Sequence, residues 1–288
     1  MSSEEKVSVF ERSRGRLFGI AYRMLGTRDD AEDIVQEAYL RWHSADSQEI
    51  ETPEAWLVTV VTRLSIDRLR KASTTRETYI GPWLPEPIRT APSPHDDVEL
   101  ASSLSIAFMT MLERLSPTER AVLLLHDVFD CEYADIARIT RKSEPAVRQM
   151  AHRARERVRT DKQRFQTNRS DHRRIIETFA RAAYAADEET LLGLFSPDIA
   201  VVSDGGGKIT AARKIVRGVA KVMRLFTIAF AKTKQHVAIE MVEINGEPGT
   251  VEYYDGQPFA VTTLEVADGQ IIRMYRVMNP DKLTAFRK

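Results

Sequence analysis

Five consecutive residues, Asp204-Gly205-Gly206-Gly207-Lys208, have the composition of a phosphate-binding loop. Glycine amides can cradle phosphates and a lysine can neutralise their charge, so the stretch raises the question of a nucleotide site. The spacing argues against one. A Walker loop reads G-x-x-x-x-G-K-[ST], whereas here the glycines are adjacent and Ile209 stands where a hydroxyl should hold magnesium. A Rossmann G-x-G-x-x-G is absent as well, so we expect the glycines to form a tight turn after a strand at 199–202.

The segment from Cys131 to Thr160, CEYADIARITRKSEPAVRQMAHRARERVRT, contains a second set of side chains that could form a binding site. A short helix is expected over 132–138, then a tight turn, then a longer helix capped by Ser143, which is the layout of a helix-turn-helix. Arginine and other polar side chains share one face of the second helix: Arg148, Gln149, His152, Arg155 and Arg159. Arg and Gln near the start of such a helix can reach base edges in the major groove. A solvated basic helix of an ordinary bundle would look similar, so the residues alone leave both interpretations open.

The charge distribution favours a nucleic-acid partner. The chain has no net charge overall, with 42 Lys and Arg against 42 Asp and Glu. Residues 138–164, however, hold ten basic and three acidic residues, which is a concentrated basic stretch. The single cysteine excludes an internal disulfide framework and fits a reducing compartment. The N-terminal MSSEEKVSVF lacks the pattern of a signal peptide, so we expect a cytoplasmic protein.

Helical periodicity and turn residues divide the chain into segments. Residues 10–71 look helical, with Thr27 and Asp30 resembling a capping box for the helix TRDDAEDIVQEAYLRW and with a further helix over 53–71. A Pro- and Gly-rich linker containing WLPEP follows, and helices return at 98–165, where Ser116-Pro117-Thr118-Glu119 predicts a capped start.

After residue 168 the pattern becomes that of an α+β domain. Helices are expected at 173–186, 188–195 and 212–230, and strands at 199–202, 236–244, 250–254, 259–266 and 271–277, with an antiparallel meander at the end. The predicted fold is therefore multidomain, with two all-α domains (1–72 and 101–168), a linker (73–100) and a C-terminal α+β domain (169–288).

Two of these segments resemble regions of bacterial sigma factors of the extracytoplasmic-function group. The order YADIA, a capping serine, AVR and HRARERVR is similar to region 4 of that group, whereas DAEDIVQEAYLRW and WLVTVVTRLSIDRLRK are similar to region 2. The resemblance covers about residues 8–165. One departure is Arg141, which occupies a turn position where the group often has glycine, so this turn must form without glycine's conformational freedom.

The resemblance implies roles for particular side chains. Recognition of the promoter −35 element would fall to Lys142, Ser143, Glu144, Arg148, Gln149, His152 and Arg153. The −10 element would be met by Arg63, Arg68 and Arg70, with the helix from Trp56. Docking on the clamp helices of the RNA polymerase β′ subunit would use Asp30, Asp33, Gln36 and Glu37. The implied partners are core polymerase, through its β and β′ subunits, and promoter DNA.

The C-terminal domain resembles the SnoaL-like α+β cone shared with ketosteroid isomerase. DGGGK, WLPEP and NPDKL (279–283) together resemble the SigJ-like branch, in which such a domain regulates the sigma factor in cis. This implies a regulatory contact made by Trp83, Leu84, Pro85, Glu86, Pro87, Asp204, Gly205, Gly206, Gly207 and Lys208. We also expect WLPEP to pack against the domain, because an exposed Trp-Leu between prolines makes a poor tether. Catalysis by Asp204, with Tyr253, Tyr254 and Arg276 lining a cavity, and small-ligand sensing remain the less favoured roles of this domain.

The sequence thus predicts a promoter-specificity subunit of RNA polymerase that is not an enzyme and needs no cofactor or metal. Two alternatives stay open. One is a helix-turn-helix regulator with a ligand-sensing domain, which would have no need of DAEDIVQEA. The other is a SnoaL-like isomerase or cyclase that carries a DNA-binding module.

Overall fold

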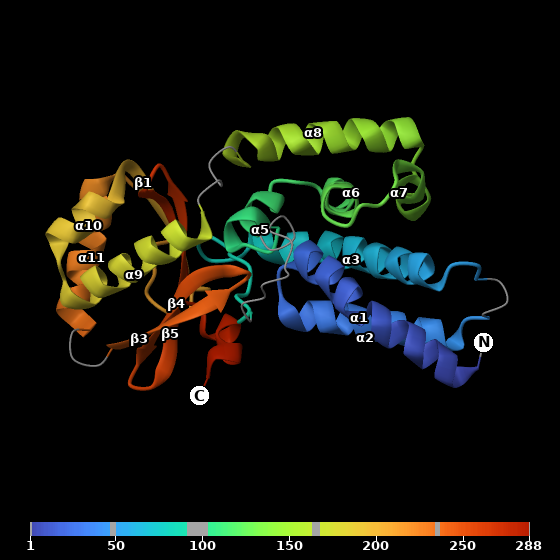
Figure 1. Cartoon of the computed structure of the whole chain (residues 1–288), viewed down its shortest axis with the longest axis horizontal. Helices are drawn as coiled ribbons and strands as arrows, with labels where there is room; N and C mark the ends of the chain where they lie inside the picture. Colours follow the sequence, from blue (N-terminus) through green and yellow to red (C-terminus); the bar gives the residue numbers. More distant parts are fainter. Residues whose placement is uncertain (1, 47–49, 91–102, 163–167, 234–236, 288) are drawn as a thin grey trace. The chain divides into compact units, whose positions relative to one another are not determined.

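The structure, a computed structural model of the whole chain, describes residues 2–46, 50–90, 103–162, 168–233 and 237–287. The chain folds into two compact units. A helical unit comprises residues 1–77 and 111–158, and a sheet unit comprises residues 78–110 and 159–288. Figure 1 shows the helices of the first unit in blue to green and the strands of the second in yellow to red. Each unit is described by itself below.

Capping and amphipathic packing define the helices of the helical unit. They are α1 (Ser3–Leu25), α2 (Arg28–Ser44), α3 (Pro53–Glu77), α6 (Pro117–Asp127), α7 (Tyr133–Thr140) and α8 (Glu144–Lys162), while α5 (Ile106–Leu112) spans the boundary between units. The predicted capping box of α6 is confirmed, with reciprocal bonds between Ser116 and Glu119. At α2 the helix starts where expected, but the Thr27 hydroxyl bonds the Asp30 carboxylate at 2.6 Å and caps no backbone amide.

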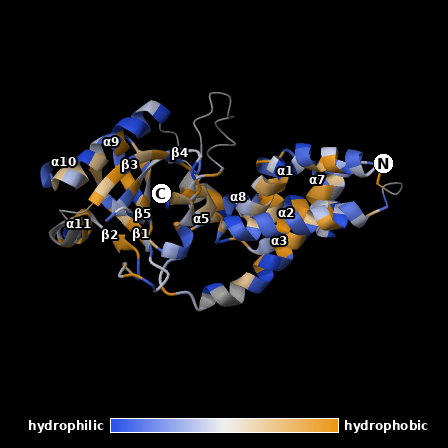
Figure 2. Cartoon of the chain, turned by 90° about the horizontal axis from the view of Figure 1, so that it is seen from below, coloured by the Kyte–Doolittle hydropathy of each residue, from blue (hydrophilic) through white to orange (hydrophobic). Residues whose placement is uncertain are grey.

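The core of the helical unit lies where the three N-terminal helices meet. Leu17, Trp42 and Leu57 are fully buried there, and the orange sides of α1, α2 and α3 face one another in Figure 2. Helix α6 packs against α1 and α3, and α7 packs against α3. A buried arginine joins these layers, because Arg120 donates to the carbonyls of Met24 at 2.7 Å and Leu112 at 2.8 Å. The two sigma-like segments therefore form one packed body.

The sheet unit has three helices on one face of a six-stranded sheet. The helices are α9 (Arg169–Ala185), α10 (Glu188–Leu194) and α11 (Val219–Thr233), and the strands are β1 (Phe195–Asp204), β2 (Val216–Arg217), β3 (Val237–Ile244), β4 (Glu247–Tyr254), β5 (Gln257–Ala267) and β6 (Gln270–Val277). The strand order is β2-β1-β6-β5-β4-β3. Strands β3 to β6 form the expected antiparallel meander, but β1 pairs with β6 in parallel.

Alternation along the strands gives the sheet two buried faces. Met274 packs under the helices with Leu264, whereas its neighbour Tyr275 packs on the opposite face with Val261 and Val277. That second face is covered by the linker, by the start of α5 and by two C-terminal 3-10 turns, Pro280–Lys282 and Thr284–Phe286. The predicted α+β class is therefore correct. The expected start of the third helix at residue 212 is wrong, because residues 205–218 form turns and the short strand β2 before α11 begins at Val219.

Candidate functional site

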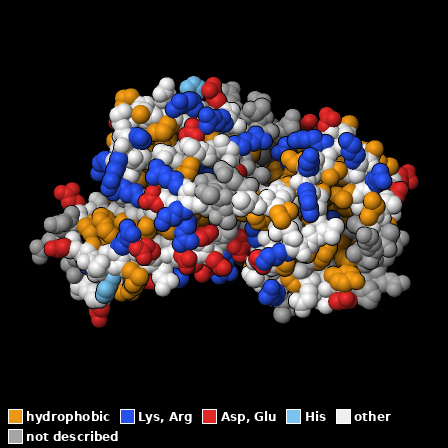
Figure 3. Space-filling view, turned by 180° about the vertical axis from the view of Figure 1, so that it is seen from behind, with side chains coloured by type: hydrophobic (Ala, Val, Ile, Leu, Met, Phe, Trp, Pro, Cys, Tyr) orange, Lys and Arg blue, Asp and Glu red, His pale blue; other side chains and the backbone are white. Residues whose placement is uncertain are grey.

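The helix-turn-helix is formed by α7 and α8. Arg141 adopts the left-handed conformation, with φ 55° and ψ 43°, and so supplies the turn in the place of a glycine. Helix α8 buries one face against the unit: Val147, Ala151, Ala154 and Val158. The predicted −35 residues lie on the other side: Lys142, Ser143, Arg148, Gln149, His152 and Arg153 are exposed and Glu144 is half-buried. Lys and Arg side chains are prominent in the upper left of Figure 3, where α8 lies.

Two arginines of α8 have different environments. Arg148 pairs with Glu144 at 2.6 Å and lies over the Tyr133 ring at 4.5 Å, yet it stays exposed. Arg155 instead binds the Asp127 carboxylate of α6 through Nε at 3.0 Å, and this contact raises the pKa of its guanidinium. The expectation that Arg155 projects with the DNA-facing side chains is therefore wrong. It ties α8 to α6.

The predicted polymerase-docking residues lie on the outer side of α2. Asp33 and Gln36 are exposed, whereas Asp30 and Glu37 are half-buried. Arg68 of α3 pairs with Asp30 at 2.6 Å and reaches Asp33 at 3.6 Å. A groove of about 400 Å³ follows this surface, and its lining includes Asp33 and Glu37 together with two leucines, Leu40 and Leu64. Leu40 is 56% exposed, which is unusual for a leucine of a packed helix.

The predicted −10 residues on α3 are each engaged within the helical unit. Arg63 donates to the carbonyl oxygens of Arg138 and Ile139, both at 2.9 Å, near the C-terminal end of α7. It thereby satisfies carbonyls that have no partner within the helix. Arg70 is exposed and pairs with Asp67 at 3.1 Å, one turn earlier on α3.

DGGGK and the linker meet at a buried carboxylate in the sheet unit. Asp204, at the end of β1, is 0% exposed. Its Oδ1 accepts hydrogen bonds from the Tyr79 hydroxyl at 2.5 Å and the Gly206 amide at 3.1 Å. Its Oδ2 accepts from the Leu84 amide at 2.9 Å and from Lys282 Nζ at 2.7 Å. We call these five residues the Asp204 clamp.

The lysine of the clamp is buried with its partners. Lys282 Nζ also donates to the Leu84 carbonyl at 2.5 Å and lies 4.2 Å from the centre of the Trp83 ring. Asn279 donates to the Tyr79 hydroxyl at 3.0 Å. Asp204 and the hydrogen bond to it raise the pKa of Tyr79, after the larger effect of burial. WLPEP, DGGGK and NPDKL are therefore three parts of one contact.

The rest of WLPEP is held by the sheet. Leu84 is 0% exposed and lies in the core under β4 and β6, while Pro85, Glu86 and Pro87 are buried. Beyond them Ile88 exchanges two hydrogen bonds with Asn245, one through its amide at 2.9 Å and one through its carbonyl at 3.0 Å. Full burial of one leucine contributes about 2–3 kcal/mol. The expectation that WLPEP packs against the C-terminal domain is confirmed.

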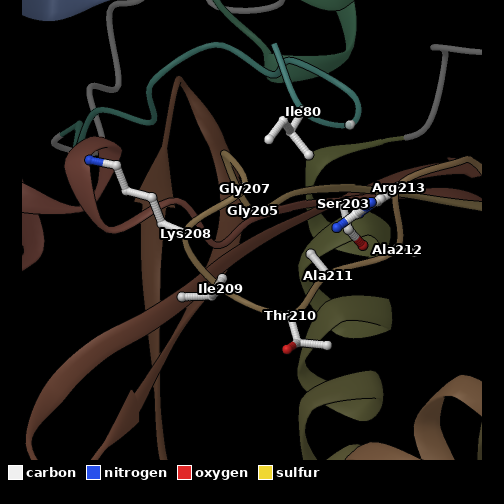
Figure 4. A pocket seen from close by; sticks show the side chains of 11 residues that line it. Ile80, Ser203, Gly205, Gly207, Lys208, Ile209, Thr210, Ala211, Ala212 and Arg213 are labelled. Carbon is white, nitrogen blue, oxygen red and sulfur yellow. The ribbon is translucent and has the colours of Figure 1, made fainter.

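The glycines of DGGGK are required by space and conformation. Gly206 has φ 59°, and a Cβ there would overlap the Asn279 amide. Gly207 has φ 72°, and a Cβ would lie 2.8 Å from Ile80 Cδ1 in the linker. Lys208 pairs with Asp281 at the surface. As Figure 4 shows, its side chain points away from a pocket of about 280 Å³ whose lining includes Ser203 and Arg213. The glycines thus allow close approach of the linker, as a tight turn predicts.

The residues considered for catalysis do not converge. Asp204 is occupied by the clamp, Tyr253 bonds Glu240 at 2.9 Å, and Arg276 pairs with Glu252 at 2.6 Å on the helix-covered face. Tyr254 is 38% exposed. Over the described part of the chain, no group of three His, Cys, Asp or Glu side chains is placed to hold a metal ion.

The carboxyl group of Glu247, in the sheet unit, has a strongly raised pKa. Burial raises the pKa of Glu247 to about 8, and the neighbouring carboxylates of Glu265 and Glu243 add to the effect. Glu265 is fully buried and pairs with Arg273 at 3.2 Å. Glu247 therefore carries its proton at neutral pH in the folded protein.

Sequence reasoning missed the partners of Asp204 and several internal arginines. Lys282 lies inside NPDKL, so the sequence indicated this motif but not the ion pair that its lysine forms. No local sequence pattern marks Tyr79 as a partner of Asp204. Arg76 and Arg120, which share the Glu113 carboxylate, likewise resemble surface residues in the sequence. In the described residues no helix has the length and apolar character needed to cross a membrane.

Comparison with known proteins agrees with this architecture. The family model for sigma-70 region 2 matches residues 9–75, and that for sigma-70 region 4 matches residues 105–158. The chain is 38% identical to the ECF RNA polymerase sigma factor SigJ of Mycobacterium tuberculosis, over 97% of this chain and 93% of that protein. It is 30% identical to a probable ECF sigma factor, SigI, of the same species, over 100% and 98%.

A solved structure extends the similarity to three dimensions. The crystal structure of the Mycobacterium tuberculosis sigma factor SigJ matches with a TM-score of 0.79 at 37% identity, over 97% of this chain and 98% of that one. The helical unit is thus that of an RNA polymerase sigma factor, with regions 2 and 4 in order. The chain belongs to the extracytoplasmic-function (ECF) sigma factors and is of the SigJ type. Sigma factors bind core polymerase and promoter DNA and are not themselves enzymes.

Proposed function

We propose that α8 reads the −35 element through its exposed face. The observation that carries this is the division of α8 into a buried apolar face and an exposed face with Arg148, Gln149 and Arg153, next to the exposed Lys142 in the turn before it. Arg148 and Gln149 lie in the first two turns, where side chains reach base edges. Lys142 and Arg153, which have no ion pair among the described residues, suit phosphates on either side.

The same proposal assigns α2 and α3 to polymerase and the −10 element. Asp33, Gln36 and Leu40 combine exposed polar groups with an apolar centre, which fits a protein partner such as the clamp helices of the β′ subunit. Arg68 and Arg70 remain close to the solvent and suit phosphates. Arg63 would have to leave the carbonyls of α7 before it could reach DNA.

The C-terminal domain acts in cis through the Asp204 clamp. The segment after region 2 is held by a buried ion pair and by Leu84, so its path is fixed by the sheet unit. Release of the clamp would free residues 78–90 and change how the two sigma regions can separate on a promoter. This role needs no small ligand, and we propose that the chain acts in the cytoplasm with its polymerase.

Transcription from purified components tests these assignments. Core polymerase with the chain should initiate at a specific promoter. Replacing Arg148 or Gln149 by alanine should cost about 1–3 kcal/mol of promoter affinity and relax the preference at one or two −35 positions. Replacing Glu156, which is exposed on the same helix outside the predicted set, is the matched control. Equal loss on every promoter sequence would contradict base recognition by these two residues.

The regulatory role of the C-terminal domain is tested by a separate measurement, the amount of transcript. Asp204→Asn should alter the amount of transcript from the same promoter while leaving the −35 preference unchanged. Asp281→Asn, which breaks the exposed pair with Lys208, should leave both unchanged. Identical transcript levels from both variants would remove the clamp from regulation without touching the assignment of α8.

A further inference from the structure

The sheet unit contains a long segment without acidic residues. Between Asp204 and Glu240 the sequence has no Asp or Glu, and it has eight Lys and Arg: Lys208, Arg213, Lys214, Arg217, Lys221, Arg224, Lys232 and Lys234. The rest of the chain has more acidic than basic residues, and its other concentrated basic stretch, at 138–164, still includes three acidic residues. An uninterrupted basic run of this length needs an explanation, because neighbouring carboxylates would normally balance it.

Five cations in the middle of this run are exposed and unpaired. Arg213 and Lys214 lie in the turns before β2, Arg217 lies in β2, and Lys221 and Arg224 lie on the exposed side of α11. None of the five side chains forms a hydrogen bond or ion pair with a residue that the structure describes. We call them the β2–α11 basic surface.

Several other surface arginines pair with carboxylates, although Arg14, Arg181 and Arg287 are exposed without an ion pair to a described residue. Arg16, Arg28, Arg41, Arg89, Arg169 and Arg173 all pair with carboxylates, although they too lie at the surface. Exposed cations without an ion pair to a described residue occur also at Lys142, in the turn before α8, and at Arg153, on the face of α8 assigned above to DNA. The β2–α11 basic surface therefore shares the feature of a predicted phosphate-contacting surface.

We propose that the β2–α11 basic surface is a second DNA-binding surface, which contacts the phosphates of duplex DNA without reading sequence. Lys221 and Arg224 are three residues apart on α11, which is about 4.5 Å along the helix axis, and they share a face. Arg217 lies in β2, two residues before the helix begins. Duplex DNA is favoured over an acidic protein because this family acts on DNA and because the five exposed cations outnumber the exposed apolar side chains beside them, Ile215 and Ile228.

Salt dependence of DNA binding tests the proposal on the full chain. The variant R217Q/K221Q/R224Q removes three cations that hold no described partner, so its fold should be kept, which its thermal unfolding checks. The matched control, R14Q/R181Q/R287Q, removes three exposed, unpaired cations outside the surface and gives the same net charge. The probe is a duplex that lacks promoter elements.

At about 0.1 M salt, we expect the surface variant to bind this duplex at least about tenfold more weakly than the unchanged protein. The slope of the logarithm of the binding constant against the logarithm of the salt concentration should be smaller in magnitude by about two to three. The loss should be equal on promoter and non-promoter duplexes, and the control should change neither quantity by comparable amounts. Equal slopes for the two variants would overturn the proposal.

A crosslinking experiment tests the same proposal in the complete initiation complex. A photoreactive residue at Ala220, which is exposed beside Lys221, should crosslink to promoter DNA in the holoenzyme complex. If it crosslinks only to a polymerase subunit, and the surface variant loses affinity for core enzyme but not for DNA, the surface faces a protein and the DNA proposal is wrong. This test is independent of the roles assigned to α8, since those predict altered sequence preference and not an altered salt slope.

Discussion

The Asp204 clamp predicts a large and specific effect of one isosteric substitution, Asp204→Asn. The carboxylate is fully buried and receives four donors, and Lys282 beside it is 8% exposed in its side chain. An asparagine of the same shape has one acceptor oxygen, so its amide must face at least one of these donors. It also leaves the lysine charge buried without a counter-ion.

The magnitude follows from that buried charge. Removing one partner of a buried ion pair costs about 3–5 kcal/mol, whereas a whole domain is stable by only about 5–15 kcal/mol. We therefore expect Asp204→Asn to destabilise the sheet unit by about 3–4 kcal/mol. The exposed pair of Lys208, four residues after Asp204, and Asp281, directly before Lys282, provides the control, because Asp281→Asn should cost less than about 1 kcal/mol.

Hydrogen exchange of the linker measures the effect locally. Peptides covering residues 78–90 should lose protection in Asp204→Asn, and urea unfolding should give the global change. The double variant Asp204→Asn/Lys282→Met should recover part of the loss, because it removes the uncompensated charge. The reasoning is refuted if Asp204→Asn costs no more than Asp281→Asn, or if the double variant loses the sum of the two single losses.

Three further outcomes follow from the geometry. Arg141→Gly should stabilise the helical unit by about 0.5–1 kcal/mol in thermal unfolding, because glycine adopts the left-handed turn without a Cβ penalty; a destabilised variant would contradict the turn. Glu247, with its pKa raised to about 8 from 4.5, is protonated in the folded protein and ionised in the unfolded chain between these values. Stability should thus fall as pH rises from about 5 to 8, and Glu247→Gln should flatten that fall by about 1–3 kcal/mol, which urea unfolding at several pH values checks. Arg63→Ala should destabilise the helical unit by about 1–3 kcal/mol without DNA, because two carbonyls of α7 lose their donor, whereas Arg70→Ala should cost less than about 1 kcal/mol in the same denaturation.

Local patterns predicted most elements of the fold, because caps and periodicity are local properties. The start of α6 at Pro117 and the strands β3, β5 and β6 were predicted within about two residues for this reason. The start of α11 was not, since the apolar residues of 212–218 suit a helix while the chain there forms turns and β2. The parallel pairing of β1 with β6 was also missed, because sequence alternation shows which face a residue takes but not which strand lies beside it.

The same distinction applies to the site residues: those whose environment depends on local spacing could be predicted, and those with distant partners could not. The exposed face of α8 could be predicted, since helical spacing separates it from the apolar face. Arg155 was assigned to that face because no local signal shows that Asp127 lies within reach. Asp204 was considered as a catalytic or partner-facing group for the same reason, as its partner Lys282 is 78 residues away. Long-range ion pairs are the part of this site that a single sequence does not show.

The clamp and the linker burial together give the C-terminal domain a physical means of control. Leu84 and the ion pair of Asp204 with Lys282 lie on the same stretch of chain, so the linker cannot leave the sheet by losing one contact alone. Their combined contribution of a few kcal/mol exceeds thermal energy several-fold, yet it lies within the range that binding to polymerase and DNA can supply. We therefore expect the linker to be held in the free protein and to be released in the initiation complex.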